Sequence, residues 1–198
     1  MKLEVGLLRR FIVYDPETGF LKWRPRVASD FRGSERRKPE TVCKAWNTKM
    51  ANREALGSID SSGYKCGLVR RKFTLAHRAA WAIHYGEWPE DQVDHINGNR
   101  TDNRIENLRA ASNQQNQHNK HTGYGTSQYK GVSWHKRDKV WRADIRINGK
   151  RISLGSFKNE TDAANAYNDA CLKHFGEYAR PNGAAAITLN EIADALDA

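Results

Sequence analysis

The chain has 198 residues, 33 Lys and Arg against 23 Asp and Glu, and a formal net charge of +10. Only 38% of the residues are hydrophobic, and no run approaches the ~20 apolar residues that cross a bilayer, which argues against an integral membrane protein. Three widely separated cysteines, Cys43, Cys66 and Cys171, form neither a disulfide framework nor a CxxC zinc knuckle, so we expect a reduced, cytoplasmic setting.

The positive charge gathers in two parts of the chain. Residues 1–88 hold 18 basic and 9 acidic groups, and residues 126–158 hold 9 basic and 2 acidic groups. From residue 159 onward the balance reverses to 2 basic against 7 acidic. Each Lys or Arg near a phosphate releases a condensed counterion, so two basic regions indicate two places that meet a polyanion. Ordinary solvated surface explains the charge alone equally well.

The N-terminal part alternates short elements with turns. Residues 7–26 predict a helical start, a turn at 15–19 and a short strand at 20–23. Residues 28–52 lack a clear period and carry many charges, so we expect a long loop there. Three strands follow at about 56–59, 64–69 and 72–75. A helix then begins at Ala76 and ends at Gly86.

A small, polar stretch at 121–128 has the composition of a linker, and we place a domain boundary there. Beyond it, 129–135, 139–147 and 151–155 predict three antiparallel strands, the last two joined by a type I′ turn at Asn148-Gly149. A helix capped near Asn159 runs to Gly176. We expect this module to occupy 129–182 and an acidic tail with a short helix to occupy 183–198.

The segment 93–119 carries the side chains suited to chemistry. Asp94 and His95 end a strand, Asn107 lies 12 residues after His95, and Asn116 lies within a helix that Ser112 can cap. Asp and Asn oxygens are hard ligands for Mg²⁺ or a similar ion, and a neighbouring histidine is suited to proton transfer. An EF-hand calcium loop beginning at Asp94 is excluded, because Asn99 occupies the position of the invariant glycine of such loops. A zinc site built from His95, His118 and His121 is a weaker alternative.

Two other features of the N-terminal part have open interpretations. His77 lies at the start of an apolar helix. We interpret it as a packed and hydrogen-bonded residue in preference to a catalytic one. The run Arg70-Arg71-Lys72 falls in a hairpin turn. It fits a phosphate contact and a solvated turn equally well.

Residues Asp94, His95, Gly98, Asn103, Asn107, Leu108 and Asn116 resemble the signature of HNH endonucleases, in the form found in phage and intron-encoded homing enzymes. The upstream segments DPETGFLKWR, GSIDSSGY and AHRAAWAIHYGEWP resemble the lead-in of phage HNH proteins. The resemblance implies a ββα-metal nuclease domain over residues 1–120 with an N-terminal extension.

The same resemblance implies a role for each site residue. Asp94 and Asn116 would hold one divalent ion against the scissile phosphate, and His95 would deprotonate the attacking water. Asn107 would bond the other imidazole nitrogen and fix its orientation. Because the third family position is Asn116 rather than histidine, Mg²⁺ or Mn²⁺ is expected as the single ion of the active site.

The C-terminal module resembles the plant ethylene-response-factor (Apetala-type) DNA-binding domain through Tyr129, Gly131, Trp141, Ala143, Leu154, Phe157 and Tyr167, among others. In that family a three-stranded sheet lies in the major groove. Alternation predicts an outward, DNA-contacting set comprising Lys130, Arg137, Arg142, Arg146 and Arg151. Ser133, His135 and Ser153 depart from the plant pattern, so the plant target preference is not carried over.

Together these observations predict an α+β protein: a ββα-metal HNH domain followed by a three-stranded antiparallel sheet packed on one helix. Its predicted function is metal-dependent hydrolysis of phosphodiester bonds in double-stranded DNA, as a homing enzyme of a phage or mobile element in the host cytoplasm. A non-catalytic, sequence-specific DNA-binding regulator is the alternative. An RNA-binding protein is disfavoured, because the sheet lacks paired exposed aromatics for base stacking.

Overall fold

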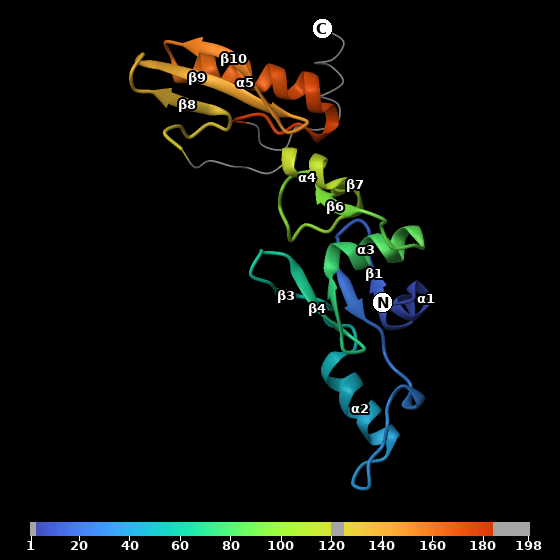
Figure 1. Ribbon diagram of the computed structural model, residues 1–198. Helices are drawn as coiled ribbons and strands as arrows, with labels where there is room; N and C mark the ends of the chain where they lie inside the picture. Colours follow the sequence, from blue (N-terminus) through green and yellow to red (C-terminus); the bar gives the residue numbers. More distant parts are fainter. Residues whose placement is uncertain (1–2, 120–124, 184–198) are drawn as a thin grey trace. The chain divides into compact units, whose positions relative to one another are not determined.

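In the computed structural model, residues 3–119 and 125–183 are described (Figure 1). They combine helices and short sheets, so the predicted α+β class is confirmed. The chain divides into two compact units, which we call unit 1 (residues 1–95 and 99–110) and unit 2 (residues 96–98 and 111–198). None of the described helices is long and apolar enough to cross a membrane. The predicted acidic tail after residue 183 and residues 121–124 of the predicted linker lie outside the described residues.

Unit 1 begins with helix α1 (Val5–Phe11), which leads into an antiparallel hairpin of β1 (Ile12–Tyr14) and β2 (Leu21–Trp23). The turn between the strands is stabilised locally, because the Asp15 carboxylate accepts hydrogen bonds from the backbone N–H groups of Glu17 and Thr18. Gly19 closes it with a φ of 73°, which a residue with a side chain rarely adopts.

The prediction of a long loop over 28–52 is wrong. A short 3-10 turn, η1 (Ala28–Asp30), is followed by a three-turn helix, α2 (Pro39–Met50). Pro39 suits the first position of that helix, since its fixed φ is helical and no N–H is needed there. Cys43 is buried, and the Trp46 ring packs edge-on against Trp23, with centroids 6.0 Å apart. Tertiary contacts therefore stabilise a helix whose charged sequence shows no strong period.

A three-stranded antiparallel sheet follows in the order β3 (Ser58–Ile59), β4 (Lys65–Val69) and β5 (Lys72–Leu75). Helix α3 (Ala76–Tyr85) comes next and ends at Gly86, which has a left-handed φ of 87°. Its alanines are fully buried, so the helix packs closely into the main core. Apolar residues from α1, β1 and β4 complete that core, with Leu8, Phe11, Ile12 and Val69 almost entirely inaccessible.

The segment that carries the predicted chemistry forms a two-stranded sheet of β6 (Gln92–His95) and β7 (Leu108–Ala111). The 3-10 turn η2 (Ile105–Asn107) ends the connection between them. Helix α4 (Asn113–Asn119) comes after β7 and is grouped with unit 2. Ser112 caps it as predicted: its Oγ accepts a hydrogen bond from the Gln115 N–H, and the Gln115 side chain accepts one from the Ser112 N–H.

Unit 2 contains a three-stranded antiparallel sheet of β8 (Val132–His135), β9 (Val140–Ile147) and β10 (Lys150–Phe157), with β9 in the centre. Helix α5 (Glu160–Phe175) packs on the sheet, and a 3-10 turn η3 (Gly176–Tyr178) follows. Asn148 and Gly149 have φ values of 49° and 78°, as the predicted type I′ turn requires. On the covered face of β9, Ala143 packs with Ala163 and Ala164 of α5, and Ile145 packs with Tyr167 and Cys171 of the same helix; all of them are buried.

Candidate active site

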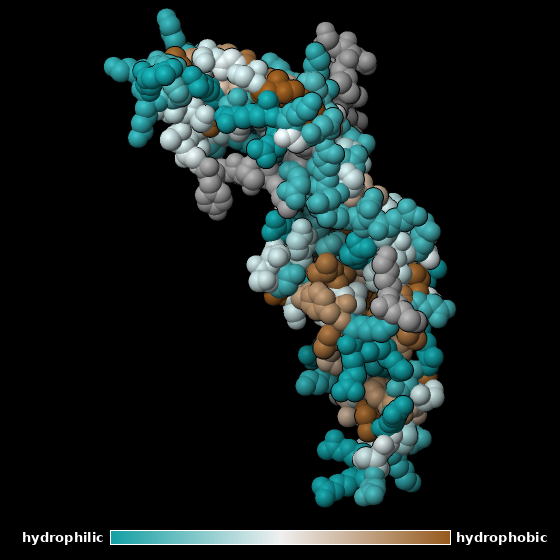
Figure 2. Space-filling model, in the orientation of Figure 1, coloured by the Kyte–Doolittle hydropathy of each residue, from teal (hydrophilic) through white to brown (hydrophobic). Residues whose placement is uncertain are grey.

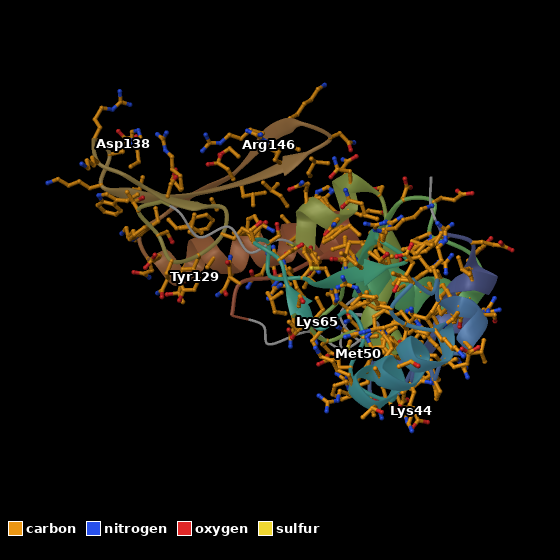
Figure 3. All side chains as sticks on the ribbon, turned by 90° about the horizontal axis from the view of Figure 1, so that it is seen from below. Lys44, Met50, Lys65, Tyr129, Asp138 and Arg146 are labelled. Carbon is orange, nitrogen blue, oxygen red and sulfur yellow. The ribbon has the colours of Figure 1, made fainter. Side chains whose placement is uncertain are left out.

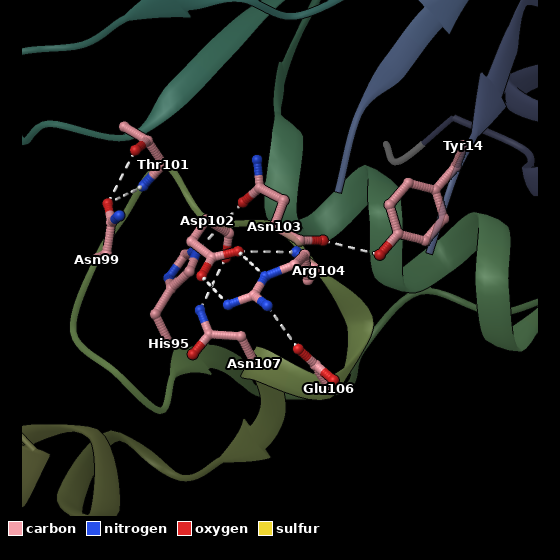
Figure 4. A network of polar contacts seen from close by, with 9 residues as sticks. All are labelled: Tyr14, His95, Asn99, Thr101, Asp102, Asn103, Arg104, Glu106 and Asn107. Carbon is pink, nitrogen blue, oxygen red and sulfur yellow. Dashed lines mark hydrogen bonds and ion pairs between the residues drawn. The ribbon is translucent and has the colours of Figure 1, made fainter. Parts of the chain in front are cut away.

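The predicted catalytic residues lie at the end of β6 and in the connection that follows. Asp94 and His95 are 5% and 3% exposed. The connection satisfies its own polar groups: the Asn99 side chain accepts hydrogen bonds from the N–H and hydroxyl of Thr101, and the Asp102 carboxylate binds the Arg104 guanidinium (Figure 4). Because these contacts are local, the loop between the two strands has a defined conformation around His95.

The His95 imidazole is held by Asn103. Its Nε2 lies 3.1 Å from the Asn103 side-chain oxygen, and both residues are buried. An acceptor at Nε2 favours the tautomer with its proton on that nitrogen, which leaves the lone pair on Nδ1. Burial lowers the pKa of His95, so the ring is neutral near pH 7. A neutral, oriented imidazole is what a general base requires.

Asn103 is itself fixed by the β1–β2 hairpin. Its backbone carbonyl accepts a hydrogen bond of 2.7 Å from the Tyr14 hydroxyl, and the Asn103 side chain is among the most buried of the protein. A methyl group added at Gly19 would lie 2.6 Å from the Asn103 carbonyl carbon, so the turn approaches too closely for any side chain. The backbone N–H of Ile105 donates to the Pro16 carbonyl at 3.0 Å. The N-terminal hairpin therefore supports the loop that orients His95.

Asn107 contributes to the same loop. Its side-chain amide donates a 2.8 Å hydrogen bond to the backbone carbonyl of Asp102, directly before Asn103. The predicted contact from Asn107 to the imidazole remains a prediction. Sequence reasoning gave Asn103 no role, although it stood in the signature, because several asparagines share this loop and spacing does not say which one faces the ring.

The predicted metal ligand Asp94 is held by an arginine. Nε and Nη2 of Arg109, on the neighbouring strand β7, lie 2.9 and 2.8 Å from the same Asp94 oxygen. This contact fixes the carboxylate plane and balances its buried charge. A fixed carboxylate oxygen fits a hard divalent ion such as Mg²⁺. The second predicted ligand, Asn116, lies on α4. Of the three histidines in the alternative zinc site, His118 and His121 have side chains outside the described part of the chain.

Two further aromatic side chains surround His95. The His77 ring, from α3, lies edge-on to it with centroids 5.1 Å apart, and Tyr64 lies 5.0 Å from His77 and 5.8 Å from His95. Burial, with His95 nearby, lowers the pKa of His77 to about 3. His77 is packed, as expected, but its buried Nδ1 has no hydrogen-bond partner within the described ranges.

In unit 2 the predicted DNA-contacting arginines lie on strands β9 and β10 and in the preceding turn. Figure 3 shows Arg146 on the side of the sheet opposite α5. Asp138 binds both Arg137 and Arg142, each at 2.9 Å, and Asp144 binds Arg151. These pairs orient the guanidinium groups on an exposed face.

Lys130 is placed differently from those arginines. It is partly buried and lies with Ile145 and Tyr167 around a cavity, and this burial lowers its pKa. Gly131, with a φ of 76°, separates it from the regular part of β8, so strand alternation does not extend to Lys130.

Comparisons with known proteins match the part of the chain that contains these residues. A model of the family described as HNH endonuclease matches residues 74–118, which include Asp94, His95, Asn107 and Asn116. Protein 3.8 of Escherichia phage T7 is 35% identical over 82 residues, 40% of this chain and 68% of that protein. The chain belongs to the HNH endonuclease family.

A second relative also comes from a virus. An uncharacterized HNH endonuclease of Acanthamoeba polyphaga mimivirus is 34% identical over 125 residues, 63% of this chain and 65% of that protein. The chain thus spans just under two thirds of this relative's length. The predicted family, HNH endonuclease, is therefore confirmed.

Proposed function

We propose that this HNH family member hydrolyses phosphodiester bonds in duplex DNA with the help of one divalent ion, Mg²⁺ or Mn²⁺. The observation that supports this best is the buried, neutral imidazole of His95, held at Nε2 by Asn103 beside the carboxylate of Asp94. A base and a hard oxygen ligand on adjacent residues are the groups needed to activate water and to balance charge on a phosphate.

Each residue then has one task. His95 accepts the proton of the attacking water at Nδ1, and Asn103 keeps the ring in the required tautomer. Asn107 holds the loop through the Asp102 carbonyl. Asp94 and Asn116 would hold the ion, with Arg109 fixing the Asp94 carboxylate. When bound, the ion supplies stabilisation of the negative charge that develops on the phosphate and on the leaving oxygen.

The three-stranded sheet of unit 2 would choose the target. In the proposal this sheet enters the major groove as in the Apetala-type domains that it resembles, and Arg142 and Arg146 reach base edges or phosphates from β9. A nuclease domain joined to a DNA-reading module suits a virus or mobile element whose enzyme must cut few sites. We therefore propose a homing-type role.

A nicking assay on supercoiled plasmid with Mg²⁺ tests the proposal. His95→Ala should reduce the single-turnover rate by ~10²–10⁴ while leaving DNA affinity nearly unchanged, because a general base adds rate and little binding. His84→Ala is the matched control, since His84 is exposed on α3. An active His95→Ala protein, or a parent protein that binds duplex DNA without cutting it, contradicts the proposed catalysis. The second result supports the DNA-binding regulator.

A further inference from the structure

A basic groove of about 650 Å³ lies in unit 1, between β2, α2 and the β4–β5 turn. Its lining includes two tryptophans and four arginines: Trp23, Trp46, Arg26, Arg32, Arg70 and Arg71. The one acidic residue of the lining, Asp30, is ion-paired with Arg10. The lining charge is therefore 4 − 1 = +3. Neither Asp94 nor His95 lines this groove.

Arg26 is held in the groove by aromatic rings. Its guanidinium carbon lies 4.1 Å from the ring centre of Trp46 and 4.6 Å from that of Phe11, and the rings of Trp23 and Phe31 are within 5.8 Å. Such contacts use the flat face of the guanidinium group. Its N–H donors lie in the plane of the group, at its edge, so the ring contacts do not satisfy them. The Arg26 Nε is buried and has no hydrogen-bond partner in the parts of the chain that are described. A buried donor without a partner suggests a missing acceptor.

Helix α2 fixes the backbone at the same residue. The Asn47 side chain accepts a hydrogen bond from the Arg26 N–H at 2.8 Å and donates one to the Arg26 carbonyl at 2.9 Å. The Cys43 thiol donates to that carbonyl as well. Both backbone groups of Arg26 are thus bound by one helix. This arrangement orients Arg26 before any ligand arrives, and the ordering cost on binding is correspondingly small.

The opposite side of the groove is a strained turn. Arg70 and Arg71, between β4 and β5, have φ values of 50° and 66°. Two-residue turns of this kind favour Asn-Gly, because both central residues need positive φ. Two adjacent arginines are a costly choice there, and backbone strain of this sort accumulates at functional sites. The turn places both side chains at the groove.

We infer that this groove binds the sugar-phosphate backbone of duplex DNA away from the scissile bond. The inference rests on the proposed DNA substrate and extends it to a second contact surface. Phosphate oxygens match the planar donor fork of an oriented arginine, and phosphates along a strand suit several cations along one groove. Figure 2 shows mostly hydrophilic side chains over the part of unit 1 that carries α2. Residues 22–38 alone hold seven basic groups against two acidic ones.

The test replaces the strained turn with its preferred sequence in the full-length chain, as Arg70→Asn with Arg71→Gly. This change removes two charges while relaxing the backbone, so the melting temperature should stay equal or rise. Binding to a duplex of mixed sequence is measured in EDTA across a range of salt concentrations. Removing one phosphate contact lowers the log–log salt slope by about 0.9, so the double variant should lower it by about 1.8.

The matched control is Lys44→Gln with Lys49→Gln, which removes two exposed charges from α2 outside the groove lining. A slope that falls by about 1.8 in the turn variant and stays within about 0.9 of the parent value in the control supports the inference. Equal slopes in the turn variant and the parent overturn it, and so does an equal decrease of the slope in both variants. If the parent itself does not bind duplex DNA, the proposed function fails first. If the parent binds and cuts DNA but the turn variant binds equally well, only this inference fails.

Discussion

Replacing Asn103 by alanine should slow DNA cleavage without weakening DNA binding. The change removes the oxygen 3.1 Å from His95 Nε2 and the side chain that fills the space beside the ring. The imidazole then loses the acceptor at Nε2 that favours its tautomer and helps to fix the ring orientation. Asn103 does not carry the proton itself, so the decrease in rate must be smaller than the decrease caused by His95→Ala.

The magnitude follows from the burial of the pair. With His95 and Asn103 only 3% and 2% exposed, a donor left unpaired costs about 1–3 kcal/mol. Removing a residue that orients a catalytic ligand typically costs ~10–100-fold in activity. We therefore expect the single-turnover rate of Asn103→Ala to fall by ~10–100-fold. Asn103→Asp has nearly the same shape and keeps an acceptor, so it should recover most of that rate.

Single-turnover cleavage of a plasmid at saturating enzyme provides the measurement, with affinity measured separately in EDTA. Circular dichroism and thermal melting must first show that each variant is folded. A folded Asn103→Ala protein that cuts within about twofold of the parent rate would refute the positioning role, because the expected decrease is at least ~10-fold. Asn107→Ala is the informative comparison. If it alone reproduces the decrease, the role that the family resemblance gave to Asn107 is correct.

The remaining predictions concern metal, pH and target choice. EDTA should stop cleavage, and added Mg²⁺ or Mn²⁺ should restore it. Neither ion should restore the activity of Asp94→Ala. Full activity in EDTA contradicts the metal requirement. His77 has a folded-state pKa of about 3 against an ordinary value of 6.5, so the unfolded chain binds the extra proton between these values. The free energy of unfolding should therefore fall by up to ~1.4 kcal/mol per pH unit as the pH drops below the ordinary histidine pKa, and His77→Phe should flatten this dependence in urea melts. The double variant Arg142→Ala with Arg146→Ala should reduce the preference for the natural site, with little change in cleavage rate. The expected loss is ~1–3 kcal/mol for each base edge that no longer receives a hydrogen bond. An unchanged site preference places target recognition elsewhere.

Much of the local structure could be predicted from the sequence, because short-range rules determine it. The turn at Asn148-Gly149 needs two positive φ values, and those two residues supply them at low cost. Ser112 caps α4 through bonds that reach only three residues ahead. The Asp94-His95 pair with Asn107 and Asn116 was recognisable for a similar reason, since the spacing of these residues reflects one hairpin and one helix.

Tertiary structure decided the rest. Helix α2 lies in a segment with no strong period, and it is stabilised by partners distant in sequence: Trp46 packs on Trp23, and Asn47 binds both backbone groups of Arg26. Helix formation in so short a segment depends mainly on such packing, which no local pattern records. The same holds for Asn103, whose position beside His95 is fixed by the Tyr14 hydroxyl, 89 residues earlier in the chain. Spacing could show that asparagines follow His95, but only the packing of the N-terminal hairpin determines which one faces the imidazole.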